Sequence, residues 1–303
     1  TVQFKPDEKE TSVYTNSLQV QVAGSYTPLQ QNVPIKLIYN KTRNSYSFLL
    51  ENFSFLMFEM GDIQVDNLTK SESNGVATYT GSQDIYIDMI GADVTANVTA
   101  KVNANGEMVA EIFIPENDDM PYDVKVSFAP ALTINPSETL EVSNATGLTN
   151  VVMNRTFAAG WNTYCMPFDY NLSSLSAEAK AQEFVSSNGY SLTFEAVNDG
   201  VLKANVPYLV YFPAETTVGT TEEPLYFVTN VASYQPTPVE HSGFTFVGNY
   251  EASKSMNGLY GVASEGDVQK IMLGTAGSTL PATCAYFTTK NLNANGLRIC
   301  FDG

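Results

Sequence analysis

The chain has 303 residues and a formal net charge of −17, with 44% hydrophobic and only 16% charged residues. The acidic excess is even: residues 1–131 hold 8 Lys/Arg against 17 Asp/Glu, and residues 132–303 hold 7 against 15. Both halves therefore repel phosphate backbones, which excludes nucleic acid as a partner, and no run of about twenty apolar residues predicts a transmembrane segment. The length suffices for two domains, and the many Tyr, Phe and β-branched residues favour strands over helices.

Short alternating stretches occupy the first 130 residues. Typical strand patterns are "SLQVQVAG", "VPIKLIY", "EMVAEIFI" and "YDVKVSFA", and the turn signals between strands include "NKTRNS", "ESNG" and "NANGE". Many short strands at hairpin spacing, without a helical segment, predict an antiparallel barrel or sandwich.

Residues 52–60, "NFSFLMFEM", are apolar on both faces if they form one strand. Phe53, Phe55 and Met57 then share one face, because side chains alternate along a strand. A strand of this kind is either covered on its outside or lines an interior. We predict these three residues as ligand-binding, although an eight-stranded barrel can equally be filled by its own bulky side chains.

A domain boundary is predicted near residue 131, where "APALTINPSETLEVSNATG" carries two prolines and no periodic core signal. The predicted domains are residues 1–131 and residues 132–303. In the second, residues 150–157 and 161–168 flank "AAG" and predict a β-hairpin. Residues 172–184, "LSSLSAEAKAQEF", predict the one short helix, since a Ser N-cap precedes good helix formers. Strand patterns resume after it, so the second domain is expected to be a β-sandwich-like domain.

The first block resembles the calycin-like β-barrel domains of secreted or surface proteins from gut Bacteroidetes. The resemblance rests on "VQVAGSYTPLQQNVPIKLIYN", "SYSFLLENFSFLMFEMGDIQVDNL", "GVATYTG" and the closing "YDVKVSFA", and it covers most of residues 10–130. It implies a barrel related in shape to lipocalins and avidin, exported from the cell, without assigned catalytic residues.

The second block resembles β-rich C-terminal modules of large surface proteins from the same bacteria. The motifs are "GWNTYCMPFDY", "ANVPYLVYFPA", "FVGNY" and "PATCAYF", in that order. The chain departs from the pattern at Asn205 and Val206, where Gly-Thr is usual, and at Cys284, where an arginine is common. The resemblance implies an adhesion-like or uncharacterised module.

The stretch around Trp161 and Cys165 raises the question of a nucleophilic thiol. A thiolate needs a base or another activating group, and the one histidine, His241, lies in the Pro-rich "PTPVEHSGF". All three cysteines lie in apolar strand-like runs, so we predict buried thiols and a core role for Cys165, with a disulfide between one pair in an oxidising compartment as the alternative. Neither a metal site nor a cofactor is predicted, because the cysteines lack metal-ligand spacing.

The turn "PENDDMPYD" brings four carboxylates close in sequence, at Glu116, Asp118, Asp119 and Asp123. Oxygen ligands of this kind suit calcium, but the spacing is not that of an EF-hand. A solvated acidic hairpin tip is the favoured interpretation, and no catalytic residue is assigned.

The sequence therefore predicts a non-enzymatic exported bacterial protein that acts by binding, either as an adhesin-like module or by capturing a small apolar ligand, a glycan or a surface protein. It is expected at the cell surface, lipid-anchored in the outer membrane, or in the periplasm. Two alternatives remain open. One is a carbohydrate-active hydrolase, which needs two carboxyl groups about 5 to 10 Å apart in a cleft. The other is a structural spacer, which predicts a filled barrel and exposed edge strands.

Overall fold

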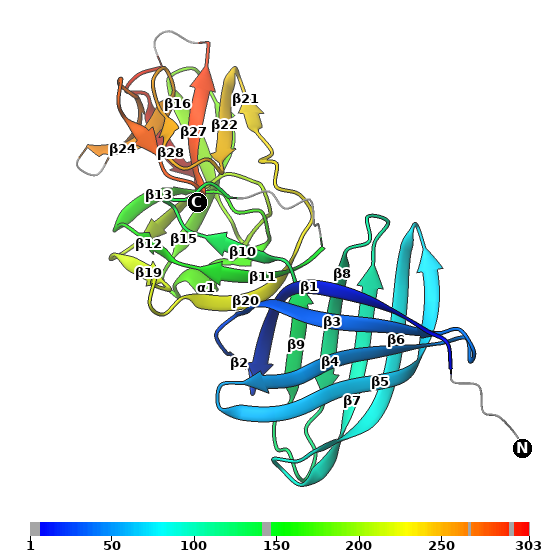
Figure 1. Cartoon of the computed structure of the whole chain (residues 1–303). Coiled ribbons are helices and arrows are strands. Elements are labelled where there is room, and N and C mark those ends of the chain that lie inside the picture. The colour runs from blue at the N-terminus through cyan, green and yellow to red at the C-terminus, as the bar shows by residue number, and fades with distance from the viewer. Residues whose placement is uncertain (1–6, 141–146, 266–267, 291–293, 303) are drawn as a thin grey trace, which may run out of the picture. The chain divides into compact units, whose positions relative to one another are not determined.

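The computed structural model describes residues 7–140, 147–265, 268–290 and 294–302 (Figure 1). These residues are mostly strands with a single four-residue helix, which confirms the all-β fold class. They form two compact units, as a two-domain protein requires. The first holds residues up to Ala131 together with Leu148–Val151 and Tyr226–Val228, and the second holds the rest. No helix among the described residues has the length and apolarity needed to cross a membrane.

The first unit is a closed antiparallel barrel. Its strands are β1 (Lys9–Val22), β2 (Ser25–Tyr26), β3 (Gln30–Asn40), β4 (Ser45–Phe55), β5 (Phe58–Ser73), β6 (Val76–Ile87), β7 (Ala92–Val102), β8 (Met108–Ile114) and β9 (Val124–Ala129). From β3 to β9, neighbours in sequence are neighbours in the sheet, β3 pairs with β1, and β1 also pairs with β9 from Ser17↔Ala129 to Val22↔Val124. This last pairing closes eight strands into a barrel, with the short β2 beside β1, so that no long edge is left exposed.

The barrel interior is filled by the protein's own side chains. Phe48 and Ile63 expose 0% of their surface and Phe128 exposes 1%, and they belong to one continuous buried cluster. Large and small buried residues are paired on adjacent strands, as at Ala110↔Phe128, an arrangement that favours close packing. A ligand-sized cavity would leave accessible area on the side chains that line it. The structure therefore has the filled barrel rather than the open one.

A buried polar cluster lies where residues 148–151 cover the barrel. Asn150 exposes 0% of its surface. Its Nδ2 lies within hydrogen-bond distance of four oxygens: Ser17 Oγ (2.9 Å), Ser17 O (3.3 Å), Ser127 O (3.2 Å) and Ala129 O (3.3 Å). These groups are on the outward face of β1 and β9, since the alternate residues point into the barrel. The Asn150 amide thus provides hydrogen-bond donors to buried oxygens of both β1 and β9.

The described residues of the rest of the chain form nineteen strands and one helix. They are β10 (Ala131–Ile134), β11 (Gly147–Met153), β12 (Arg155–Phe157), β13 (Gly160–Tyr164), β14 (Tyr170–Asn171), α1 (Leu172–Leu175), β15 (Lys180–Ser187), β16 (Ser191–Ala196), β17 (Val201–Leu202), β18 (Tyr208–Phe212), β19 (Thr216–Val218), β20 (Leu225–Val231), β21 (Val239–His241), β22 (Phe244–Asn249), β23 (Lys254–Ser255), β24 (Tyr260–Glu265), β25 (Val268–Leu273), β26 (Thr279–Leu280), β27 (Cys284–Thr289) and β28 (Arg298–Asp302).

The main sheet of the second unit is a curled, half-barrel sheet. Its order is β13-β18-β15-β16-β28-β25-β24-β27-β22-β21. Strands β13 and β28 stand four positions apart, which in a flat sheet means about 19 Å. Yet the rings of Trp161 on β13 and Phe301 on β28 stack with centroids 4.2 Å apart. The sheet must therefore curl over, and the chain's single tryptophan packs across its concave side.

The helix is shorter than predicted. Only Leu172–Leu175 forms α1, and residues 180–187, which have good helix formers, are strand β15. In β15, Ala181 and Phe184 are buried while Glu183 is exposed, and the strand pairs with β16 on one side and β18 on the other. The prediction of a helix through Phe184 is wrong because these tertiary pairings outweigh local propensity.

Two further strand predictions are wrong. Residues 150–157 and 161–168 do not pair as a hairpin: β11 lies between β10 and β20, β12 pairs with β19, and β13 pairs with β18. Residues 52–60 are not one strand either, because a turn at Leu56 and Met57 separates β4 from β5. The pattern with apolar residues on both faces arose because the end of β4 and the start of β5 were treated as a single strand.

Cys165 lies in the core of the second unit, as predicted. Its thiol donates to the Tyr250 hydroxyl at 3.6 Å, and burial raises its pKa to about 12. The three cysteines are free thiols. Cys165 is buried and Cys284 is half-buried, but Cys300 is exposed, so the prediction of three buried thiols is wrong for Cys300. In β28 the buried position is Ile299, and alternation turns its neighbour outward.

Replacing Gly248 by alanine is expected to destabilise the second unit by roughly 1–3 kcal/mol. A Cβ at this position would overlap the Cys165 side chain and lie 3.0 Å from Pro236 Cβ. Cys165→Ala removes the overlapping sulfur, so the double variant should lose less stability than the two single variants together. Urea unfolding followed by Trp161 fluorescence measures this coupling, and strictly additive losses would contradict the packing described.

Candidate functional site

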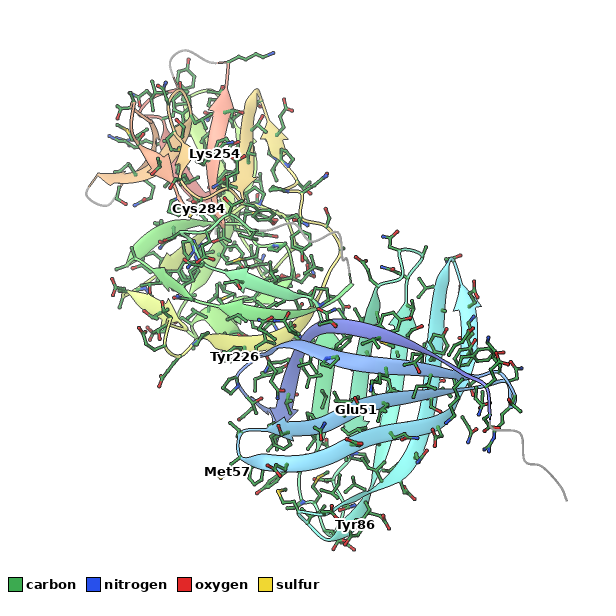
Figure 2. The ribbon with its side chains drawn as sticks, viewed as in Figure 1. Glu51, Met57, Tyr86, Tyr226, Lys254 and Cys284 are labelled. Carbon is green, nitrogen blue, oxygen red and sulfur yellow. The ribbon has the colours of Figure 1, made fainter. Side chains whose placement is uncertain are left out.

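Exposed apolar side chains gather at one end of the barrel. We define the barrel rim as Leu56, Met57, Phe58, Tyr86, Met89, Phe113 and Tyr122, all of which are large and exposed. Met57 exposes 87% of its surface and Leu56 exposes 70%. Figure 2 shows Met57 and Tyr86 at the same end of the barrel. Among the described residues of the barrel, Val13 is the one other exposed side chain of this class.

The up-and-down topology explains why these residues meet. Successive antiparallel strands turn at alternate ends of a barrel, so the β4–β5, β6–β7 and β8–β9 connections all lie at one end. The rim residues belong to these three connections or to the strand residues beside them. Segments more than sixty residues apart in the sequence therefore form one surface.

Hydrogen bonds tie the segments at this end together. The Gln30 side chain donates to Ser54 O at 2.7 Å, which joins the start of β3 to the end of β4. The Asn117 side chain donates to Asp93 O at 3.3 Å, which joins the β8–β9 loop to β7. Beneath the rim, the Phe55 and Phe58 rings lie 5.6 Å apart, with Phe55 in the buried core. The exposed side chains thus stand on an ordered base.

Leu56 has an unusual backbone conformation. It occupies the first position of a two-residue turn between the paired Phe55 and Phe58, with φ of 54°. A bulky residue at positive φ is disfavoured, and glycine or asparagine is the ordinary choice there. Stability therefore does not explain an exposed leucine at this position, and such outliers concentrate at functional sites.

A pocket of about 300 Å³ opens at the same end of the barrel. The residues that line it include Glu116, Tyr122, Asp123 and Lys125. Asp123 Oδ1 accepts a hydrogen bond of 2.8 Å from the Glu116 backbone N–H. Two acidic residues and a tyrosine therefore line one pocket at the rim end of the barrel.

The three residues predicted as ligand-binding do not share one environment. Phe53 and Phe55 lie in the buried core with their rings 5.7 Å apart, whereas Met57 is exposed in the turn. The remaining rim residues were not predicted. Apolar residues inside turn sequences, such as Met89 in "DMIGAD", are the signal that could have identified them.

The structure gives the other candidate residues ordinary surroundings. His241 lies in β21 with its ring against Phe184, at 5.1 Å between centroids, and Cys165 contacts Tyr250 instead. In the acidic turn, Asn117 Oδ1 accepts hydrogen bonds from the backbones of Asp119 and Met120. Across the described ranges, no three or more His, Cys, Asp or Glu side chains gather closely enough to hold a metal ion.

The closed eight-stranded antiparallel barrel defines the class of the first domain, and a family comparison agrees with it. Residues 11–130, about two fifths of the chain, match the calycin-like β-barrel domain family. The N-terminal unit is therefore a calycin-like barrel domain, as the sequence motifs indicated. Neither the curated proteins nor the solved structures contain a match to the chain.

Proposed function

We propose that this is a non-enzymatic, exported protein that binds its partner through the barrel rim. The observation that carries the proposal is the gathering of exposed apolar side chains at one end of the barrel, since such patches mark interaction sites. Export to the cell surface or the periplasm is supported by the resemblance of both halves to secreted and surface proteins. Calycin-like barrels commonly bind ligands, which is compatible with a binding role.

The filled interior supports binding on the outside of the barrel rather than inside it. Ligand capture of the lipocalin type needs an open cavity, and Phe48 and Phe128 occupy the space instead. Phe53 and Phe55 then support the rim from below rather than contact a ligand. Of the predicted ligand-binding residues, Met57 is the one we retain as a contact residue.

Two other functions have a specific observation in their favour. A carbohydrate-active hydrolase is supported by Glu116 and Asp123, which line one pocket with Tyr122. A structural spacer in a surface assembly is supported by the filled barrel. Turnover of a glycoside that is lost in Glu116→Gln favours the hydrolase, and the absence of any binding partner favours the spacer.

The variant Leu56→Gly is expected to be as stable as the wild type, or up to about 1 kcal/mol more stable, and to bind its partner less tightly. Glycine relieves the positive φ and removes one of the two most exposed apolar side chains of the rim. Stability is measured by urea unfolding, and binding by screening the full chain against a glycan array and a panel of immobilised proteins.

The matched control is Val13→Ser, which removes an exposed apolar side chain of β1 that lies outside the rim. It should leave both stability and binding unchanged. Unaltered binding by Leu56→Gly, or equal losses in the two variants, would contradict a role for the rim.

A further inference from the structure

We infer that the partner of the barrel rim is a basic polypeptide that also carries apolar side chains. This inference rests on the proposed function and names the chemistry of its partner. It follows from the charges around the rim, which differ from those at the opposite end of the same barrel.

The rim end of the barrel is acidic. Residues 53–61, 86–93 and 113–125, the three connections with their flanking residues, hold seven Asp/Glu and one basic residue, Lys125. Lys125 Nζ lies 6.0 Å from the centroid of the Phe113 ring. Within the described parts of the chain, none of the seven carboxylates forms an ion pair with a Lys or Arg. Seven carboxylates against one lysine leave this end with a net charge of −6.

The opposite end is electrically balanced. Residues 7–12, 40–45, 70–78 and 101–108 hold five Asp/Glu and five Lys/Arg. Several of them pair: Lys41 with Glu10, Arg43 Nε with Asp7 at 2.9 Å, and Lys70 with Glu72 at 3.6 Å. Both ends are made by connections between the same strands, so the barrel fold does not require the asymmetry. The uncompensated charge belongs to the rim itself.

The combination of apolar and negative groups selects the class of partner. An anionic membrane attracts basic rather than acidic loops, so the carboxylates oppose insertion of Leu56 and Met57 into a lipid surface. A second copy of the chain brings the same carboxylates and repels the first. A neutral apolar ligand does not neutralise the carboxylates. A polypeptide with Lys or Arg beside apolar side chains complements both features.

The test uses the full chain and three synthetic peptides of equal length with alternating Lys and Leu, alternating Glu and Leu, and alternating Lys and Ser. Fluorescence anisotropy of the labelled peptides measures the affinity at low and at high salt. The Lys–Leu peptide should bind at least about tenfold more tightly than either other peptide, and its affinity should fall as salt screens the carboxylates.

Matched variants separate rim binding from attraction to an acidic protein as a whole. The double variant Asp118→Asn with Asp119→Asn removes two exposed carboxylates of the rim end. It should lower the affinity for the Lys–Leu peptide about tenfold. Glu222→Gln with Glu223→Gln removes an equally exposed neighbouring pair from the second unit and should leave the affinity unchanged. Leu56→Gly should also lower the affinity for the Lys–Leu peptide, while Val13→Ser should leave it unchanged.

Equal affinity for the Lys–Leu and Glu–Leu peptides, no binding of the Lys–Leu peptide, or equal effects of the two acidic double variants would overturn the inference. The same experiments distinguish failure of this inference from failure of the proposed function. If Leu56→Gly loses a partner found on the array while the wild type shows no preference for the Lys–Leu peptide, the rim is a binding surface but its partner is not a basic polypeptide.

Discussion

At neutral pH, Asn150→Asp is expected to destabilise the protein by roughly 3–5 kcal/mol, although the two side chains have nearly the same shape. Asn150 is fully buried, and its Nδ2 faces four oxygens from Ser17, Ser127 and Ala129. Aspartate places an oxygen where the donor was. The three backbone carbonyl oxygens then face another acceptor, while the Ser17 hydroxyl can still donate, and a negative charge is left buried without a cation beside it.

The loss of stability caused by Asn150→Asp should become smaller as the pH is lowered. A protonated carboxyl group is neutral and again donates one hydrogen bond, so acid removes the buried charge and restores part of the contact. Urea unfolding followed by circular dichroism, at neutral pH and at a pH where carboxylates are protonated, measures both effects.

Asn154→Asp is the control for Asn150→Asp. Asn154 lies four residues later and its side chain donates to Thr221 Oγ1 at 2.8 Å in an exposed position. Asn154→Asp should lower the free energy of unfolding by no more than about 0.5 kcal/mol. A similar small loss for Asn150→Asp would show that the amide does not hold β1 and β9 in the way described.

The second large effect concerns alkaline pH. Burial raises the pKa of the Cys165 thiol from 9.0 to about 12. A group whose pKa is raised in the folded state contributes stability that is complete below its unfolded pKa and is lost as the pH rises through the folded value. The contribution of Cys165 should therefore fall between pH 9 and pH 12, by about 4 kcal/mol in all, at 1.36 kcal/mol for each pKa unit.

Burial explains why the Cys165 thiol resists ionisation, and it outweighs the hydrogen bond with Tyr250, which lowers the pKa of the thiol. The thiol donates to the Tyr250 hydroxyl, which donates to Asn205 Oδ1 at 2.8 Å, and Asn205 Nδ2 donates to Ser233 O at 3.0 Å. Burial also raises the pKa of Tyr250, with Cys165 adding to it. The chain of donors ends at a backbone carbonyl, so it offers no group that takes up the thiol proton.

The measurement compares wild type with Cys165→Ala from pH 8 upward, by urea unfolding followed through Trp161 fluorescence. At neutral pH the alanine variant should be less stable, because the sulfur and its packing are lost. The difference should shrink and then reverse above pH 9, since only the wild type must keep a buried thiol protonated. Cys300→Ala removes an exposed thiol and serves as control. Parallel curves for wild type and Cys165→Ala would be inconsistent with a raised pKa.

Much of the local structure was predictable from the sequence because it depends on periodicity. In β7, Val94, Ala96 and Val98 alternate with half-buried Thr95 and Asn97, and the burial follows the pattern directly. The conformation of Asn205 also has a local explanation. Its φ is 64°, a conformation that glycine adopts freely and asparagine tolerates.

The failures occur where a distant partner decides the outcome. Residues 180–187 have helix-forming composition but become β15, because β16 and β18 offer pairing on both sides. The hairpin predicted around "AAG" does not form, because β12 pairs with β19 and β13 with β18. Neither partner can be read from the segment itself.

The sequence by itself determined the all-β class, the calycin-like character of the first block and the buried place of Cys165, since alternation, turn residues and apolar runs act over a few neighbouring residues. Only the tertiary structure decided that the barrel is filled, that Met57 lies in an exposed turn, and that the rim is one surface. Those properties depend on which hairpins end at the same edge and which side chains meet inside a closed sheet. Contacts between residues far apart in the chain set both.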